Sequence, residues 1–322
     1  MVKAAILEDF RKPFAVREVD LKPPEEGWAR VRVRAVGVCG RDVVVWRGGF
    51  PNLKPPLILG HEVFGEYEGK PVGVYAGITS RECRERGLVE PLCGDYSILG
   101  ENYPGGYAEE VYAPRENLVP LPDRDYEKYA ASVCGVATII HASRLAGVAG
   151  GSKILVTGAT GGVGIHAIQY LVLLGAEVYA TTRSPEKAET IEALGATPII
   201  AEKGFGKKLA QKHGRVDAVI ELVGAATINE SMRALKPGGT LVLVGNTEGK
   251  PIEITRPAML VMREYKIVGS AAFTLNEYRT AVKIVGRGQI KPFYKKYRLE
   301  EINKAYEDIV SGKIVGRAVL VL

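Results

Sequence analysis

Residues 153–175 read KILVTGATGGVGIHAIQYLVLLG, and this stretch decides the fold. A short apolar run at 154–156 breaks at a glycine-rich turn, and an apolar helical segment follows. Glycines let a backbone approach a pyrophosphate closely, and the start of the helix presents N–H groups and a positive dipole end to it. The glycine spacing departs from strict G-x-G-x-x-G, so an ordinary tight turn is the alternative. The residues predicted to contact a dinucleotide are Gly158, Thr160, Gly161, Gly162 and Val163.

Strand-like and helical runs alternate after this turn. Strands are expected at 154–157, 178–182, 197–200, 216–223, 240–244 and 266–269, and helices at 163–174, 185–194, 205–213 and 226–235. Such alternation predicts a doubly wound parallel sheet of the Rossmann type with right-handed crossovers. The strand at 266–269 would form the sheet edge, where dimerisation by sheet extension is expected.

Local punctuation supports these boundaries. Ser184 is expected to cap the helix at 185–194, Pro185 suits its first turn and Gly195 can end it. Residues 236–239 (KPGG) are expected to form a turn before the fifth strand.

The first 130 residues have a different texture. Residues 28–38 (WARVRVRAVGV) alternate small apolar side chains with arginines, as in a half-buried strand, and proline and glycine then interrupt the chain often. The tail at 299–322 predicts a helix and a strand that return to this part. The expected domains are therefore a β-rich catalytic domain at 1–133, with 271–322 returning to it, and a nucleotide domain at 134–270.

Composition sets limits on function. The chain has 322 residues, of which 46% are hydrophobic and 25% charged, so disordered and fibrous classes are excluded. No apolar run of about 20 residues exists, and no signal peptide is evident, so we expect a cytoplasmic protein without a membrane partner. The net charge is +6, but basic and acidic residues are interspersed, so no nucleic-acid partner is expected. The scarcity of glutamine is typical of a thermophilic source.

The second predicted strand indicates which nicotinamide cofactor binds. An acidic residue at its end would bind a ribose 2′-hydroxyl, but none is present. Thr182, Arg183 and the nearby Lys187 suit a 2′-phosphate instead, which predicts NADPH over NADH. A solvated Arg183 is the alternative.

Cys39, His61 and Cys134 each lie in a loop beside a predicted strand end or domain boundary. Two thiolates and an imidazole form a three-ligand set that leaves Zn²⁺ one open position for a substrate. Buried structural cysteines and a core histidine would give the same residues, because sequence spacing does not prove convergence.

With these residues and the glycine turn, the whole chain resembles the medium-chain dehydrogenase/reductase superfamily, in its zinc alcohol dehydrogenase branch. The most specific part is Gly60-His61-Glu62-x-x-Gly65, followed by Cys134 and the glycine turn. The resemblance implies an α/β protein with a GroES-like β-rich catalytic domain and a Rossmann domain. It implies zinc held by Cys39, His61 and Cys134, with Glu62 as an alternate ligand and Asp42 behind the His61 ring. The residues expected at the cofactor are Thr138, Gly245, Asn246 and, on the pyrophosphate, Arg317.

The chain departs from this family where the substrate proton is relayed. The Ser or Thr two residues after the first cysteine is Arg41, and the His three further on is Val44. A guanidinium stays charged and cannot relay protons at neutral pH. The Cys-x-Arg-Asp form is similar to archaeal acryloyl-CoA reductases, where Arg41 would stabilise an oxyanion.

A second departure concerns the lobe in which the family often binds a structural zinc with four cysteines. Only Cys83 and Cys93 occur in that region. They could form a disulfide, bind zinc with help from a carboxylate, or be free, and we favour the disulfide.

These observations predict an NADPH-dependent oxidoreductase that acts on a small carbonyl or alcohol substrate, with Cys39, Arg41 and His61 at the reacting centre. The alternative is an NADPH-dependent enoyl reductase that acts on an acyl-CoA or quinone-type substrate. A third possibility is a protein that binds NADPH without turnover. A homodimer or homotetramer is expected.

Overall fold

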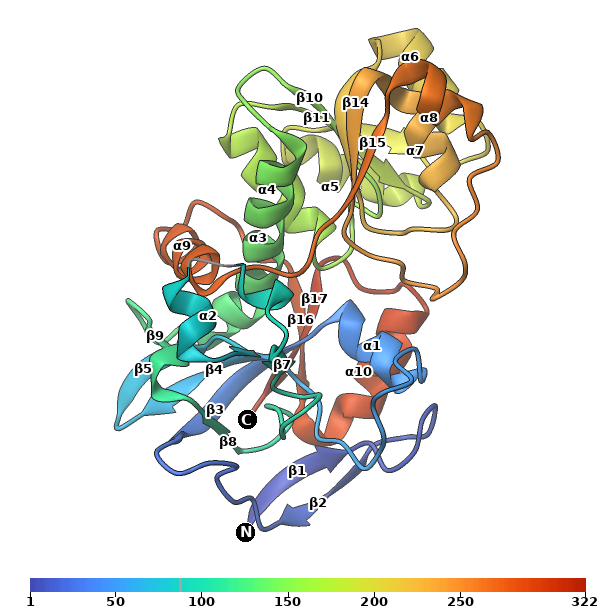
Figure 1. Cartoon of the computed structure of the whole chain (residues 1–322). Coiled ribbons are helices and arrows are strands. Elements are labelled where there is room, and N and C mark those ends of the chain that lie inside the picture. Colours follow the sequence, from blue (N-terminus) through green and yellow to red (C-terminus); the bar gives the residue numbers. More distant parts are fainter. Residues whose placement is uncertain (87–88) are drawn as a thin grey trace. The chain divides into compact units, whose positions relative to one another are not determined.

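The computed structural model describes residues 1–86 and 89–322 (Figure 1). The chain forms two compact units: the first comprises Met1–Ala137 and Phe273–Leu322, and the second comprises Thr138–Ala272. The first unit therefore contains both ends of the chain. In the described ranges, no helix combines the length and apolar character that crossing a membrane would require.

The first unit is built on a seven-stranded sheet. Its strands run in the order β16-β17-β3-β4-β5-β9, and β8 also pairs with β3. Their bounds are β3 Ala29–Val38, β4 Glu62–Tyr67, β5 Lys70–Val74, β8 Glu110–Ala113, β9 Leu118–Pro120, β16 Tyr294–Arg298 and β17 Arg317–Val321. In Figure 1 the red strand β17 lies beside the blue strand β3, and the two pair antiparallel. The C-terminal strand is thus part of the sheet of the first unit.

Smaller elements complete the first unit. Two short antiparallel pairs join β1 (Val2–Ile6) to β2 (Ala15–Val19) and β6 (Gly77–Ile78) to β7 (Ser97–Ile98). Its helices are α1 Gly40–Trp46, α2 Arg81–Glu85, α9 Leu275–Gly286 and α10 Ile302–Val310, and α3 Tyr126–Ala146 continues into the second unit.

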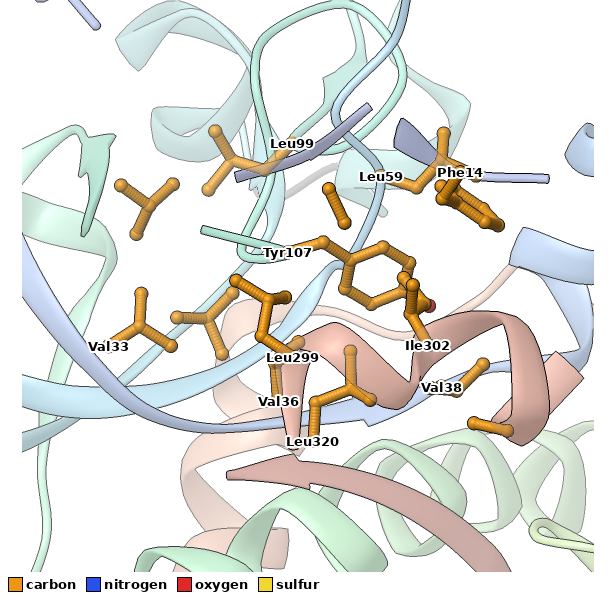
Figure 2. Close-up of a cluster of buried hydrophobic side chains, with 14 of the residues drawn as sticks. Phe14, Val33, Val36, Val38, Leu59, Leu99, Tyr107, Leu299, Ile302 and Leu320 are labelled. Carbon is orange, nitrogen blue, oxygen red and sulfur yellow. The ribbon is translucent and has the colours of Figure 1, made fainter. Parts of the chain in front are cut away.

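Strand β3 has the predicted alternation. Ala29, Val31 and Val33 are buried while Arg30 and Arg32 are exposed, so one face of the strand meets the core. Its register with β4 shifts between Val33 and Ala35, and both faces are buried from Ala35 to Val38. Figure 2 shows part of the core that these strands form.

The second unit contains a six-stranded sheet with the order β12-β11-β10-β13-β14-β15, in which all pairs are parallel. The strands are β10 Lys153–Val156, β11 Glu177–Thr182, β12 Thr197–Ile200, β13 Val216–Glu221, β14 Leu235–Leu243 and β15 Lys266–Gly269. The helices are α4 Gly164–Leu173, α5 Ala188–Ala193, α6 Phe205–His213, α7 Ile228–Ala234 and α8 Ala258–Arg263. The order reverses beside β10, as in a Rossmann fold, so the predicted doubly wound sheet is confirmed.

Both faces of this sheet are covered, which explains the unbroken apolar run of β10. Ile154 and Val156 pack with α4 residues such as Ile168 on one face. Leu155 packs with Phe205 of α6 and Ile228 of α7 on the other. Strands buried on both faces have continuous rather than alternating hydrophobicity.

Two local predictions were wrong. Ser184 occupies the position before the helical segment, but its side chain makes no capping hydrogen bond, and a 3₁₀ turn (Pro185–Lys187) precedes α5. Residues 236–239 do not precede the fifth strand but lie within β14. Gly238 has φ +72° there, and the register with β13 shifts between Val216 and Ala218, so the strand accommodates the turn as an irregularity.

Candidate metal centre and cofactor-binding residues

The first unit brings together four residues with metal-binding side chains: Cys39, His61, Glu62 and Cys134. One ligand atom from each lies within 4.8 Å of those of the others. We call this group the metal-ligand cluster. It contains every residue that the sequence predicted as a metal ligand.

Strand pairing explains this convergence. Cys39 follows the end of β3, and His61 precedes the start of β4. The two strands are antiparallel, with Gly37 opposite Glu62, so the end of one strand lies beside the start of the other. Cys134 comes from α3.

Asp42 holds the imidazole of His61. Its Oδ1 lies 3.0 Å from Nδ1 of His61, and its Oδ2 accepts a hydrogen bond of 2.9 Å from the backbone N–H of Cys39. A carboxylate can only accept, so Nδ1 carries the proton and Nε2 is left for a metal. Burial lowers the pKa of His61, but the charges of Asp42 and Cys39 raise it more, so its net shift is upward.

Glu62 is almost fully buried, and neither of its carboxylate oxygens accepts a hydrogen bond from the residues that the structure describes. Its Oε1 forms an ion pair of 3.1 Å with Nη2 of the buried Arg317. A Cβ on Gly37 would lie 2.0 Å from Oε2, so the glycine makes room for this carboxylate. Burial raises the pKa of Glu62 to about 8, against the effect of Arg317. Buried oxygens without hydrogen bonds, beside two thiols and an imidazole, are a donor set that fits Zn²⁺.

The two thiols of the cluster differ in acidity. A hydrogen bond from Cys134 lowers the pKa of Cys39 well below its usual range, and the charge of His61 acts in the same direction. The same hydrogen bond, followed by burial, raises the pKa of Cys134. Cys39 is therefore the first thiolate of the pair, which is the protonation state that a metal requires.

Arg41 is held by a partner that the sequence analysis missed. Both Nε and Nη2 of Arg41 donate to the carboxylate of Glu101, the second at 2.9 Å. The guanidinium also lies over the Phe50 ring, 4.6 Å from its centroid. The side chain of Glu101 is 6% exposed and that of Arg41 is 41% exposed, so a half-exposed cation rests on a buried anion. No sequence signal links positions 41 and 101, because helix α1 and a turn far from it in the chain supply them.

In the second unit, the glycine turn links β10 to α4. Gly158 has φ +59°, and a Cβ on Gly164 would lie 2.4 Å from the carbonyl oxygen of Gly158, so both positions require glycine. Thr181 fixes the turn by accepting hydrogen bonds from the N–H groups of Gly158 and Ala159. Gly161 is exposed in the turn that precedes α4, and the first N–H groups of a helix lack intrahelical partners. The turn thus has the form that a pyrophosphate site requires.

The residues expected at the ribose follow β11. Thr182 is buried, and its hydroxyl pairs locally with the backbone of Ser184. Arg183 is exposed and has no ion-pair partner within the described residues. Lys187 ends the 3₁₀ turn that follows.

The other expected cofactor residues belong to different elements of the chain. Thr138 is a buried residue of α3, and Gly245 and Asn246 follow β14. Oδ1 of Asn246 is buried without a hydrogen-bond partner in the described part of the chain. Arg317 lies in the first unit, against Glu62 of the metal-ligand cluster.

Cys83 of α2 is joined to Cys93 by a disulfide, with a Cα–Cα distance of 6.3 Å. Both cysteines are thereby removed from metal binding. Cys39 and Cys134 are not disulfide-bonded.

Comparison with known proteins agrees with this geometry. Residues 25–123 match the family of the alcohol dehydrogenase GroES-like domain, and residues 162–287 match that of the zinc-binding dehydrogenases. The chain is 31% identical to an acryloyl-coenzyme A reductase of Metallosphaera sedula, over 99% of each chain. It is 32% identical to an alcohol dehydrogenase of Geobacillus stearothermophilus, over 99% of each chain.

A solved structure shares the whole fold. The alcohol dehydrogenase of Aeropyrum pernix superimposes with a TM-score of 0.90, at 27% identity, over 99% of this chain and 100% of the other. The chain belongs to the zinc-containing alcohol dehydrogenase family of the medium-chain dehydrogenase/reductase superfamily and is an NAD(P)-dependent oxidoreductase.

Proposed function

We propose that the chain reduces a small carbonyl compound with NADPH, at a zinc centre held by Cys39, His61 and Cys134. The convergence of the metal-ligand cluster within 4.8 Å carries this proposal. When bound, zinc supplies Lewis-acid polarisation of a carbonyl oxygen. Asp42 orients the imidazole of His61. Glu62, which forms an ion pair with Arg317, provides an alternate ligand.

NADPH, rather than NADH, is the proposed cofactor. The exposed guanidinium of Arg183 follows directly after β11, with Lys187 one short turn later and no acidic residue at the strand end. A positively charged, uncommitted side chain favours a 2′-phosphate. The glycine turn, Thr138, Gly245 and Asn246 are proposed to hold the rest of the dinucleotide, and Arg317 its pyrophosphate. Dissociation constants of both cofactors, measured by fluorescence titration, test this; tighter binding of NADH would overturn it.

Reduction of an enoyl thioester is a second candidate, because the geometry of Arg41 favours it. Glu101 occupies Nε and Nη2, and the plane of the guanidinium rests on Phe50, while Nη1 has no partner among the described residues. Such a fixed donor suits an oxyanion that develops on a thioester carbonyl. In this reaction the hydride would reach the β-carbon, and a proton from solvent would complete the product. The relatives include proteins named acryloyl-coenzyme A reductase.

A single assay separates the candidates. NADPH oxidation is followed at fixed protein concentration with matched panels of ketones, aldehydes and enoyl-CoA thioesters. Turnover of ketones or aldehydes supports the first candidate, and turnover of the thioesters alone supports the second. No oxidation with any panel would contradict both, and would support a protein that binds NADPH without turnover.

We also propose that the chain forms a homodimer, or a homotetramer built from such dimers, through the β15 edge. Strand β15 is the last in its sheet, and the adjacent α8 exposes Val261 and Met262 by 78% and 82%. An unpaired strand edge beside exposed apolar side chains favours pairing with a second copy. Sedimentation equilibrium tests this, and Met262→Lys should shift the protein towards monomer. A wild-type monomer at micromolar concentration would contradict it.

A further inference from the structure

Tyr107 combines a core position with a hydroxyl that has a specific partner. Its side chain is fully buried, and Figure 2 shows its ring among apolar side chains such as Leu59, Phe14 and Ile302. A phenylalanine would fill the same space without a polar atom. A buried tyrosine hydroxyl therefore calls for an explanation, because it must find a hydrogen-bond partner.

That partner is the carboxylate behind the metal-ligand cluster. The Tyr107 hydroxyl donates to Oδ2 of Asp42 at 2.9 Å. The hydroxyl of Tyr306 lies 3.4 Å from that of Tyr107. Because Tyr107 uses its proton on a carboxylate, its oxygen can only accept from Tyr306. Asp42 is 1% exposed, so Tyr107, Cys39 and His61 supply its donors in place of water.

The same tyrosine also contacts the backbone that carries His61. A Cβ on Gly60, which has φ +96°, would lie 2.5 Å from Cδ1 of Tyr107, so the ring packs directly against this glycine. The backbone N–H of Tyr107 donates to the carbonyl of Leu59 at 3.0 Å. Tyr107 thus holds both the segment before His61 and the carboxylate that orients the His61 ring.

We propose that Tyr107 is a positioning residue of the metal centre. Its hydroxyl fixes Asp42, Asp42 fixes Nδ1 of His61, and Nε2 is thereby aimed at the metal. The proposal rests on the proposed zinc site, but it concerns a residue that is not a ligand. Hydrogen-bond partners of ligating histidines affect metal affinity although they never touch the metal.

The experiment compares two variants that each lose one buried hydroxyl, Tyr107→Phe and Tyr306→Phe. Zinc affinity is measured by competition with a chromophoric chelator, and Co²⁺ absorption reports ligand geometry. We expect Tyr107→Phe to weaken zinc binding about tenfold and to change the Co²⁺ spectrum, whereas Tyr306→Phe should stay within about twofold. Thermal unfolding of the metal-free proteins shows whether both variants keep the fold.

A double-mutant cycle tests the route through Asp42. In an Asp42→Asn background, removal of the Tyr107 hydroxyl should weaken zinc binding less than about twofold, because the carboxylate that it holds is gone. Equal losses in the two tyrosine variants, an unchanged affinity in Tyr107→Phe, or an undiminished loss in the Asp42→Asn background would overturn the proposal.

Two further outcomes can be told apart from a failure of the Tyr107 proposal alone. A wild-type protein that binds no zinc would overturn the proposed metal centre itself, and with it this inference. Should Tyr107→Phe fail to fold, the test is NMR of the wild-type protein with labelled tyrosine ring carbons, recorded with and without zinc. The Tyr107 resonance should then shift on zinc addition, and an unmoved resonance contradicts the proposal.

Discussion

Glu62 in the first unit and Glu221 in the second are both almost completely buried, with exposures of 2% and 0%, but their surroundings differ. Glu221 ends β13, and its carboxylate accepts hydrogen bonds from Thr157, Val223, Gly224, Thr227 and Ser231. The carboxylate oxygens of Glu62 have no hydrogen-bond partner of this kind in the described residues, and Oε1 forms an ion pair with Arg317.

This difference separates a structural carboxylate from one that is available to a ligand. Every donor around Glu221 belongs to the chain, so nothing remains for a bound molecule to satisfy. These hydrogen bonds connect Thr157, which follows β10, to the loop after β13 and to Ser231 of α7. Around Glu62 the chain leaves buried oxygens without hydrogen bonds, beside two thiols and an imidazole. The ion pair with Arg317 offsets part of the cost of burying the Glu62 carboxylate, and a metal bound by the cluster would offset the rest.

The largest expected effect concerns Glu221. Replacement by alanine leaves buried hydroxyl and N–H donors unsatisfied, so Glu221→Ala should lower the free energy of unfolding by roughly 3–5 kcal/mol. Ser231→Ala, which removes one donor, should cost about 1 kcal/mol. Urea unfolding of metal-free protein measures both. Equal losses in the two variants would show that the carboxylate does not organise this region.

Arg41 tests the first unit, where we propose that charged side chains take part in the reaction. Arg41→Met should lower kcat/KM for an enoyl thioester about a hundredfold, because it removes the fixed oxyanion donor. Arg41→Met also leaves the buried carboxylate of Glu101 without its ion-pair partner, so thermal unfolding must show that the variant is folded at the assay temperature. Arg32→Met, on the exposed face of β3, is the matched control and should leave the rate unchanged. An Arg41→Met enzyme as active as the control would remove Arg41 from the reacting centre.

Arg183 should give the smallest effect of the three. Arg183→Ala should weaken NADPH binding about tenfold and leave NADH binding unchanged, because one charge-assisted contact to a 2′-phosphate is lost. Fluorescence titration with both cofactors measures this. Lys203→Ala, which removes another exposed positive charge of the second unit, is the control. A parallel loss of both cofactors would indicate a role other than phosphate recognition.

The sequence predicted the elements whose signal is local. Alternation revealed β3, the glycine-rich break between an apolar strand and an apolar helix revealed the turn before α4, and repeated runs revealed the parallel sheet. The irregularity inside β14 was missed because a lysine, a proline and two glycines are typical of a turn in isolation. The residues on either side of it, Leu235 and Thr240, pair with β13, and only this makes the segment part of a strand.

The partners of the site residues could not be predicted in the same way. Glu101 meets Arg41, Tyr107 meets Asp42, and Arg317 meets Glu62, and in each pair the two residues come from elements distant in the chain. Such contacts depend on strand register and on packing, and residues 103–107 carry no pattern of their own. Side-chain chemistry alone left the roles of Cys39, His61 and Cys134 open. The resemblance of Gly60-His61-Glu62-x-x-Gly65 to the zinc alcohol dehydrogenase family identified them as a ligand set.

The central claim is that the chain holds a metal at Cys39, His61 and Cys134, and elemental analysis of purified protein tests it most directly. The wild type and Cys83→Ala should each contain about one zinc per chain, whereas Cys39→Ala should contain far less. Zinc retained at the wild-type level by Cys39→Ala, or lost from Cys83→Ala alone, would contradict the account.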